Sequence, residues 1–583
     1  MKFLRNFLAS FLALVIFSVL GVLVFVGVIA VMSAEETVKV SSKSILHLNL
    51  DRPISEVEFE NPFGEVGIVA SSPSSIGLVQ LKEVIAHAKS NENIEGILLE
   101  SPRLMAGKAT VEEIRMALED FKSSGKFVVA YGEYYTEGAY YLASVADEIY
   151  MHPEGDLEFN GLSANVTFLK GLFDKLNIEP QIFRVGQFKS AVEPLMRTDM
   201  SEENRLQLTS MLNSINNHSI ANVAKSRGLS EADVKQMSEE MLARQPEDAV
   251  KYGLLDSLTY YDGVISFLKK KVGKDEDKDL SLVKYEKYKK NVGSFKSSDN
   301  EVAVIVASGE ITSGEGDMNT IGSDSFVKEI RKARKDDGIK AIVLRINSPG
   351  GSFVASDIMW REIKLTSEVK PVIASMSDVA ASGGYYMSMA CDTIVAQPNT
   401  ITGSIGIFGV IFNFKDFLND KLGVTNEEVN TGKFSGMLTV TRPLTEEEKA
   451  IVQEDINNGY ETFVTKAAQG RGMTVDNIKS VASGRVWTGE QAKNNGLVDI
   501  LGDFDDAVKI AANAAGVQDD YKVRYYPKQR SIFEEFFKEL EGDTKAEAIK
   551  AELGELYPYF EMLKKTENLK GVQARLPYEL NLN

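Results

Sequence analysis

The chain contains an internal duplication, which constrains its fold more than any other feature of the sequence. The segment from Asn91 to Gly161 aligns on the segment from Asp336 to Gly406 without a gap. The identical positions include aliphatic residues, glycines, tyrosines, an aspartate and a proline: Ile94/Ile339, Ile97/Ile342, Leu99/Leu344, Gly138/Gly383, Tyr140/Tyr385, Tyr141/Tyr386, Asp147/Asp392, Pro153/Pro398 and Gly161/Gly406. Repetition of this kind indicates two copies of one structural unit.

Within each copy, short apolar runs alternate with longer amphipathic segments. In the second copy, 325–335 and 355–368 show the apolar spacing of helices. Alternating strands and helices predict an α/β fold in which helices cover a mostly parallel sheet. Four apolar runs of the second copy have the length of buried strands: 302–307, 341–346, 371–375 and 393–396.

The duplication and the shifts in composition divide the chain into five segments. They are an N-terminal membrane anchor at 1–35, a first repeat at 36–265, a charged linker at 266–300, a second repeat at 301–527 and a helical tail at 528–583. The lysine-rich linker is typical of a solvated surface, with contact to phospholipid as the alternative. Within the tail, 531–540 has the amphipathic spacing of a helix, so we expect this stretch to pack on the body of the protein rather than bind a partner.

The N-terminus carries a long apolar run. Residues 7–32 are nearly all apolar, with Lys2 and Arg5 before them and Glu35 after them. A run of this kind reaches the roughly 20 residues that cross a bilayer, whereas the core of a signal peptide has about 7–15. Basic residues at the start predict that this end stays in the cytoplasm and that the rest is exported. The alternative is a long signal sequence cleaved near Ser33, which also implies export.

Composition excludes several classes of protein. The formal net charge of −19 argues against a nucleic-acid-binding protein, which would present a basic face. The single cysteine, Cys391, excludes an intramolecular disulfide and a cysteine-based metal site. Its apolar neighbours indicate a small buried side chain. We expect no metal site.

Two glycine-rich turns distinguish the second copy from the first. The sequences Asn-Ser-Pro-Gly-Gly-Ser at 347–352 and Ala-Ala-Ser-Gly-Gly-Tyr at 380–385 each follow an apolar strand and precede a helix. Glycines at such turns let backbone N–H groups point at a developing oxyanion. The second turn therefore suggests Ser382 as a nucleophile and Gly383 as an oxyanion donor.

The first of these turns offers the second donor, either Gly350 or Gly351. In the first copy a methionine and an alanine stand at these positions, and Glu137 stands at the position of Ser382. Conversely, Lys189 of the first copy falls on a serine of the second. Each copy therefore lacks one component of the site.

Lysine is the candidate base because the second copy has no histidine. A Ser-His-Asp triad drawn from one unit is therefore excluded for Ser382. Burial lowers the pKa of a lysine from about 10.4 toward neutrality, and the neutral amine can then take the serine proton. Asp378 has no histidine to orient, so we expect it to lie in a turn. The four histidines all lie in the first half of the chain: His47, His87, His152 and His218.

At these residues the chain resembles the signal peptide peptidase A family of the long, duplicated type, which is peptidase family S49 in the Clp protease/crotonase superfamily. The resemblance covers nearly the whole chain. It rests on Ala381–Tyr385 around the serine, Phe188–Pro194 around the lysine, Asn347–Gly351 and Thr402–Gly406. It implies two tandem Clp protease/crotonase-like repeats with mostly parallel sheets, preceded by one N-terminal transmembrane helix.

The resemblance also implies a site and an activity. Ser382 would be the nucleophile and Lys189 the general base of a membrane-bound serine endopeptidase that degrades remnant signal peptides without a cofactor. Ser404 would hydrogen-bond the lysine, although a Thr-Gly-Ser turn is commonly structural. The tyrosines 385 and 386 recur in both copies, which indicates a packing role.

The same resemblance implies a homotetramer in the bacterial inner membrane, held by its N-terminal helix, with the catalytic body on the periplasmic side. Whether lysine and serine pair within one chain or between chains stays open. Two other classes of protein are the alternatives. A crotonase-type acyl-CoA enzyme is opposed by the export signal and does not need a Ser/Lys pair. A non-catalytic membrane scaffold is opposed by the presence of both dyad residues.

Overall fold

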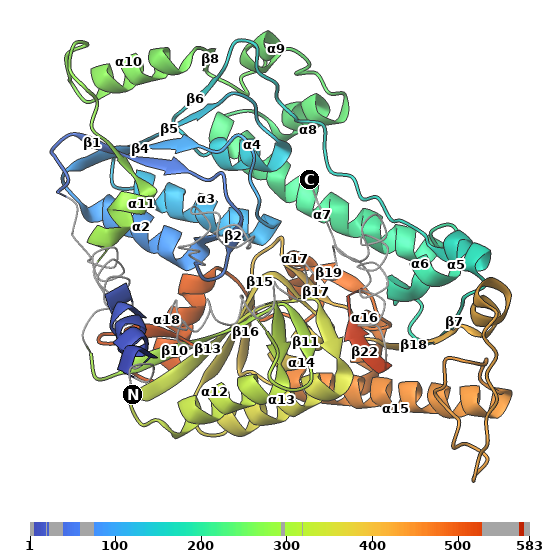
Figure 1. Ribbon diagram of the computed structural model, residues 1–583. Coiled ribbons are helices and arrows are strands. Elements are labelled where there is room, and N and C mark those ends of the chain that lie inside the picture. The colour runs from blue at the N-terminus through green and yellow to red at the C-terminus, as the bar shows by residue number, and fades with distance from the viewer. Residues whose placement is uncertain are drawn as a thin grey trace.

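Two α/β units make up the protein in the computed structural model (Figure 1). The first unit, in blue to green, lies above the second, in yellow-green to orange, and each has its own hydrophobic core. The structure describes residues 5–7, 9–18, 20–21, 39–58, 75–292, 298–317, 319–526 and 571–576.

A parallel sheet of six strands forms the first unit, in the order β8-β6-β5-β4-β1-β9. Its strands are β1 (Ser44–Asn49), β4 (Ile94–Glu100), β5 (Phe127–Gly132), β6 (Glu148–Met151), β8 (Ser257–Leu258) and β9 (Leu282–Lys284). Its helices are α2 (Leu78–Ser90), α3 (Lys108–Lys122), α4 (Glu137–Ala143), α7 (Glu202–Arg227), α8 (Glu231–Glu239), α9 (Pro246–Lys251), α10 (Tyr261–Lys271) and α11 (Tyr285–Tyr288).

The second unit repeats this plan on an eight-stranded sheet in the order β19-β17-β15-β13-β10-β21, with β16 beside β15 and β20 beside β16. All pairs are parallel except β17 with β19. Its strands are β10 (Glu301–Ser308), β13 (Ile339–Ser348), β15 (Val372–Ala381), β16 (Thr393–Ala396), β17 (Ile401–Gly403), β19 (Val486–Thr488), β20 (Ile500–Leu501) and β21 (Lys522–Tyr526). Its helices are α12 (Ser323–Lys335), α13 (Phe353–Ser367), α14 (Gly383–Ser388), α15 (Glu446–Arg471), α16 (Val475–Val481), α17 (Gly489–Asn494) and α18 (Phe504–Ala514).

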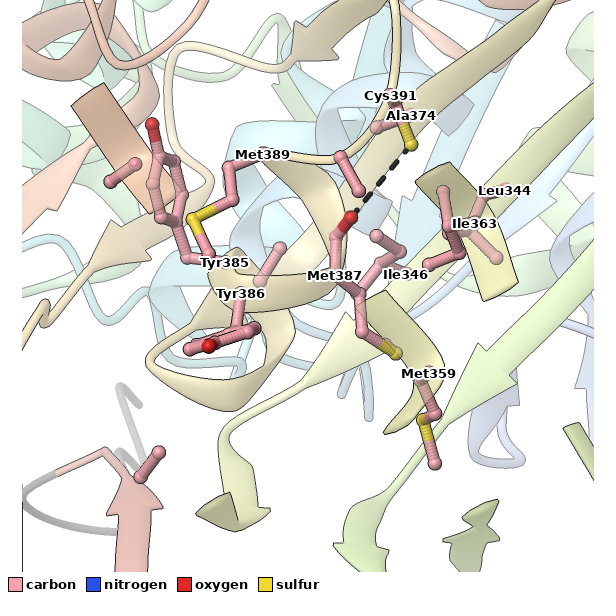
Figure 2. Packing of buried hydrophobic residues seen from close by; sticks show 14 of the residues in the cluster. Leu344, Ile346, Met359, Ile363, Ala374, Tyr385, Tyr386, Met387, Met389 and Cys391 are labelled. Carbon is pink, nitrogen blue, oxygen red and sulfur yellow. Dashed lines mark hydrogen bonds between the residues drawn. The ribbon is translucent and has the colours of Figure 1, made fainter. Parts of the chain in front are cut away.

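The predicted duplication, strands and helices are confirmed, down to individual hydrogen bonds. The Tyr140 hydroxyl donates to the carbonyl oxygen of Leu254 at 2.8 Å, and the Tyr385 hydroxyl donates to that of Leu497 at 3.0 Å. Figure 2 shows Tyr385, Tyr386 and Met387 of α14 in the second core, together with Cys391, which follows that helix. The buried positions confirm the packing role expected for the tyrosine and the cysteine.

A third sheet joins the two units, in the order β12-β11-β14-β22-β18-β7. Its outer strand β7 belongs to the first repeat and pairs antiparallel with β18 of the second along its whole length. Because the chain turns toward the second unit here, the residues that follow β7 reach the site. The strands are β7 (Glu179–Val185), β11 (Glu310–Thr312), β12 (Thr320–Gly322), β14 (Gly350–Ser352), β18 (Ile407–Asn413) and β22 (Gly571–Arg575).

The expected linker at 266–300 is for the most part not a linker. Strand β9 extends the first sheet beside β1, and Val283, Tyr285 and Tyr288 are buried in the first core. These apolar side chains lie among lysines in the sequence. Because the segment is highly charged overall, its composition does not indicate the short strand.

The expected tail and anchor lie largely outside the described residues. Of the tail at 528–583 the structure describes 571–576, of which 571–575 form a strand and not a helix. Of the expected membrane-spanning run, residues 7, 9–18, 20 and 21 are described, and they are helical. Among all described residues, no helix is both long and apolar enough to cross a membrane.

A buried network of charges holds the two units together. Arg345 of β13 lies 2.7 Å from Glu56 and 2.8 Å from Glu113 of the first unit. Glu113 also lies 3.0 Å from Lys82 of α2, which contacts Asp503 of the second unit at 2.9 Å. Burial disfavours both cations, but the carboxylates outweigh it and raise the pKa of Lys82 and Arg345 above their ordinary values.

Asp378 also joins the units, and it lies in β15 and not in a turn as expected. Its carboxylate accepts hydrogen bonds from the Thr110 N–H at 2.8 Å and the Thr110 hydroxyl at 2.6 Å. Thr110 lies in the first turn of α3, so the aspartate caps a helix of the other unit. A Cβ at Gly107 would stand 2.2 Å from its Cγ, so glycine allows this approach.

We predict that Glu113→Ala lowers the free energy of unfolding by about 3–5 kcal/mol, because it leaves two buried cations without their shared partner. Denaturant unfolding of the variant measures this. Glu119→Ala is the matched control, since Glu119 is 47% exposed and pairs only loosely with Arg115 at 3.5 Å. It should change stability by less than about 1 kcal/mol. Equal losses in the two variants would contradict the role of the network.

Candidate active site

Ser382 stands in the turn between β15 and α14, with φ 55° and ψ −109°. This backbone conformation is strained for a residue with a side chain. Two hydrogen bonds hold it: the Ser382 N–H donates to the Gly403 carbonyl at 2.8 Å, and the Tyr386 N–H donates to the Ser382 carbonyl at 2.8 Å. Strain that the surrounding structure enforces is common at functional serines on such turns.

Ser404 lies beside Ser382 because their strands are neighbours. The parallel register of β15 and β17 pairs Ala381 with Gly403, so the next residues of both strands lie side by side. Ser404 also has a positive φ, 51°, and its N–H donates to the Arg485 carbonyl at 2.7 Å. Both serines are fully buried.

Lys189 enters this site from the first repeat. Its Nζ lies 2.9 Å from Ser382 Oγ, 3.0 Å from Ser404 Oγ and 3.1 Å from the Ser404 carbonyl oxygen. These residues belong to one chain, so pairing within a chain is geometrically complete. The side chain is fully buried.

Burial lowers the pKa of Lys189 well below its usual value of 10.5. Desolvation is the cause, and no carboxylate of the described residues opposes it. Burial therefore favours the neutral amine form of this lysine. Such an amine can donate its two N–H groups to the oxygens of Ser404 and keep its lone pair for the proton of Ser382.

Gln207 of α7 holds the residues on both sides of the lysine. Its amide Nε2 donates to the Phe188 carbonyl at 3.1 Å and to Ser190 Oγ at 2.7 Å. Its Oε1 accepts from the N–H of Val486 in the second unit at 3.2 Å. Gln207 thus ties the lysine segment to β19, and no local pattern in the sequence points to it.

Gly484 gives the lysine room. A Cβ there would stand 2.6 Å from the Lys189 backbone nitrogen, and the Phe188 N–H donates to the Ser483 carbonyl at 3.0 Å. Gly406 has a similar role, since a Cβ there would stand 3.2 Å from Lys189 Cδ. The Ser-Gly pair at 483–484 predicts a turn, but the sequence does not predict the contact of this turn with the distant lysine.

The two glycine turns meet next to Ser382. A Cβ at Gly350 would stand 2.6 Å from the backbone nitrogen of Gly383, so the turns pack backbone against backbone. The Gly350 N–H donates to Ser348 Oγ at 3.2 Å. Because that amide already has a partner, the amides of Gly383 and Gly351 are the better candidates for an oxyanion site.

The first unit holds a different arrangement at the equivalent position. The carboxylate of Glu137 accepts the N–H groups of Asn160 and Gly161, both at 3.0 Å. Burial raises the pKa of this carboxyl even though the two amides oppose the shift. A glutamate that binds two backbone amides closes the turn that the serine occupies in the second unit.

The chain matches a known protein family and several known proteins. Residues 120–275 and 364–518 each match Peptidase family S49, and together they make up over half of the chain. The chain is 39% identical over 458 residues to the chloroplastic serine protease SPPA of Arabidopsis thaliana, covering 77% of this chain and 67% of that protein.

Two bacterial proteins named Protease 4 are also similar. The one from Salmonella typhi is 37% identical over 489 residues, covering 82% of this chain and 78% of that protein. The one from Haemophilus influenzae is 33% identical over 527 residues, covering 86% and 84%. One matched segment lies mostly in each repeat, and the second segment contains the serine turn. The chain therefore belongs to Peptidase family S49 and is a serine-type protease.

Proposed function

We propose that the protein is a serine endopeptidase with a Ser/Lys dyad, in which Ser382 is the nucleophile and Lys189 the general base. One observation supports this most strongly: the fully buried Nζ of Lys189 lies 2.9 Å from Ser382 Oγ. Neither an acyl-CoA enzyme nor a membrane scaffold needs a desolvated lysine at a strained serine.

In the proposed reaction, neutral Lys189 takes the proton of Ser382 as Oγ attacks the peptide carbonyl carbon. The amides of Gly383 and Gly351 stabilise the oxyanion that forms. The lysine then gives its proton to the leaving amine, and the acyl group stays on the serine. Water, deprotonated by the same lysine, releases the product and restores Ser382. Ser404 keeps the amine oriented through both steps.

We further propose that the substrates are apolar peptides at a membrane, above all signal peptides left after their release from preproteins. The apolar run at 7–32 supports a bilayer anchor, and the basic residues before it support an inner-membrane position with an exported catalytic body. A homotetramer is proposed on the resemblance to the family alone.

A fluorophosphonate should label wild-type protein at Ser382. Ser382→Ala should abolish the labelling, and Lys189→Ala should lower peptide hydrolysis by on the order of 10⁴-fold or more, because the serine then lacks a base. Lys433→Ala is the control for loss of a lysine, since that side chain is 64% exposed. It should leave both readouts unchanged. Normal hydrolysis by Lys189→Ala would disprove the dyad.

The value of kcat/KM should rise with pH through a single ionisation well below 10.5. The sign follows from the base: protonated Lys189 cannot accept the serine proton, and the amine becomes active as pH passes its lowered pKa. His152→Ala should keep the same profile. A profile that follows an ionisation near 10.5, or one that changes in His152→Ala, would count against a desolvated lysine.

Gly484→Ala should lower kcat/KM by on the order of 10²-fold, because its Cβ would displace the Lys189 backbone. Gly472→Ala is matched in strain, since the two glycines have φ 78° and 60°, but a Cβ at Gly472 meets nothing within 4 Å. Gly472→Ala should cost about 1–2 kcal/mol of stability and keep kcat/KM. Equal activities of the two variants would show that Gly484 does not position the lysine.

A further inference from the structure

A buried carboxylate lies a few residues after the lysine of the candidate site. Glu193 begins the short helix α6 (Glu193–Met196), and its side chain is fully buried. Among the described residues, its carboxylate contacts uncharged hydrogen-bond donors and pairs with no cation. A charge in such a position is costly unless several donors are directed at it. The proposed reaction does not use this group, so its position needs another explanation.

The first turn of α7 supplies the donors. The Ser201 hydroxyl donates to Glu193 Oε1, and the Ser201 N–H donates to Oε2 at 3.3 Å. Asn204 Nδ2 donates to the same Oε2 at 3.0 Å. An ionised carboxylate can only accept hydrogen bonds. It therefore holds the Asn204 amide with its nitrogen toward Glu193 and its oxygen away from it.

Asn204 passes this orientation on to Gln207, and the two side chains form an amide relay. Asn204 Oδ1 accepts from Gln207 Nε2 at 3.1 Å, which directs Gln207 Oε1 to the N–H of Val486 in the second unit. The same Nε2 donates to the residues before and after the lysine, Phe188 and Ser190. The charge at one end thus sets the direction of a hydrogen-bonded chain that ends at the lysine segment.

Burial makes the direction of this relay important. Each of its side chains, the carboxylate included, is at most 1% exposed, so water cannot replace a broken hydrogen bond. A reversed relay would place Gln207 Oε1 against the Phe188 carbonyl, two acceptors face to face. The segment would have to move, and Lys189 Nζ would leave its position 2.9 Å from Ser382 Oγ.

We propose that Glu193 is a positioning residue of the protease: its charge holds the amide relay in the direction that keeps Lys189 at Ser382. This inference rests on the proposed function. Glu193 acts through hydrogen bonds and not through its field at the amine, because desolvation alone lowers the pKa of Lys189.

Glu193→Gln tests the role of the charge, since it keeps the size of the side chain but adds a donor that lets the relay reverse. We expect kcat/KM to fall by on the order of 10²-fold, through kcat and with KM unchanged, because the base is misplaced and the substrate contacts are not. The ionisation in the pH profile should also move upward, toward 10.5, because a loosened lysine is better hydrated.

The double variant Glu193→Gln/Asn204→Asp moves the carboxylate one step along the relay. The new carboxylate at position 204 can accept from Gln207 Nε2 and from the new amide at position 193, so the relay keeps its direction. This variant should regain most of the lost kcat/KM and the wild-type pH profile. A loss of packing or of folding stability alone would not be rescued in this way.

Glu448→Gln is the matched control. Glu448 is 1% exposed and lies in the first turn of α15, which has 26 residues like α7. Its carboxylate accepts the Thr445 N–H at 2.8 Å, but it pairs with Arg442 and not with an amide relay. Glu448→Gln should lower stability and leave kcat/KM and its pH profile unchanged.

Wild-type kcat/KM and pH profile in Glu193→Gln would overturn the proposal, and so would a folded double variant that stays as slow as the single one. If only the double variant folds, as judged by circular dichroism, its kcat/KM decides. Failure of both to fold would also overturn the proposal, because Glu193 would then support the fold as a whole. The dyad is tested separately: a wild-type protein that a fluorophosphonate does not label at Ser382 would overturn the proposed function itself.

Discussion

To act as the proposed base, Lys189 has to lose its charge, and its burial between the two repeats lowers its pKa in that direction. A lysine in water keeps its proton at neutral pH and cannot act as a base. Lys189 is fully buried, with its Nζ against the oxygens of Ser382 and Ser404 and with desolvation alone lowering its pKa. Other residues hold Lys189 in this contact with the two serines. Gly484 leaves space for the lysine backbone, and Gln207 ties its segment to the second unit.

The duplication explains why the site lies where it does. Each unit alone is a complete α/β fold with its own core, but only the second has the serine turn and only the first supplies the lysine. The relative position of the units therefore determines whether the dyad forms. Contacts far from the serine fix that position, namely the charges around Arg345, the cap that Asp378 places on α3, and the pairing of β7 with β18. Substitutions in these contacts can lower activity without touching the site.

Much of the fold and part of the candidate site can be predicted from the sequence, because they follow from local sequence patterns. The strands and helices follow from apolar spacing, and comparison of the copies together with the family resemblance points to Ser382 and Lys189. The features that the sequence does not predict depend on contacts between segments that are distant in the chain. No local sequence pattern indicates the roles of Gln207 and Gly484. The sequence also does not predict the role of Asp378, because its hydrogen-bond partner Thr110 lies in the other repeat. Strands β9 and β22 are short and lie in charged stretches of the sequence. The sequence therefore predicts a linker in place of β9 and a helical tail in place of β22.

The most direct test of a base and a nucleophile drawn from two repeats is the crystal structure of the protein after reaction with a fluorophosphonate. We expect phosphorus on Ser382 Oγ, a phosphoryl oxygen at the amides of Gly383 and Gly351, and Lys189 Nζ of the same chain within roughly 2.6–3.2 Å of that Oγ. An adduct on another residue, or a Lys189 that points away into solvent, would contradict it.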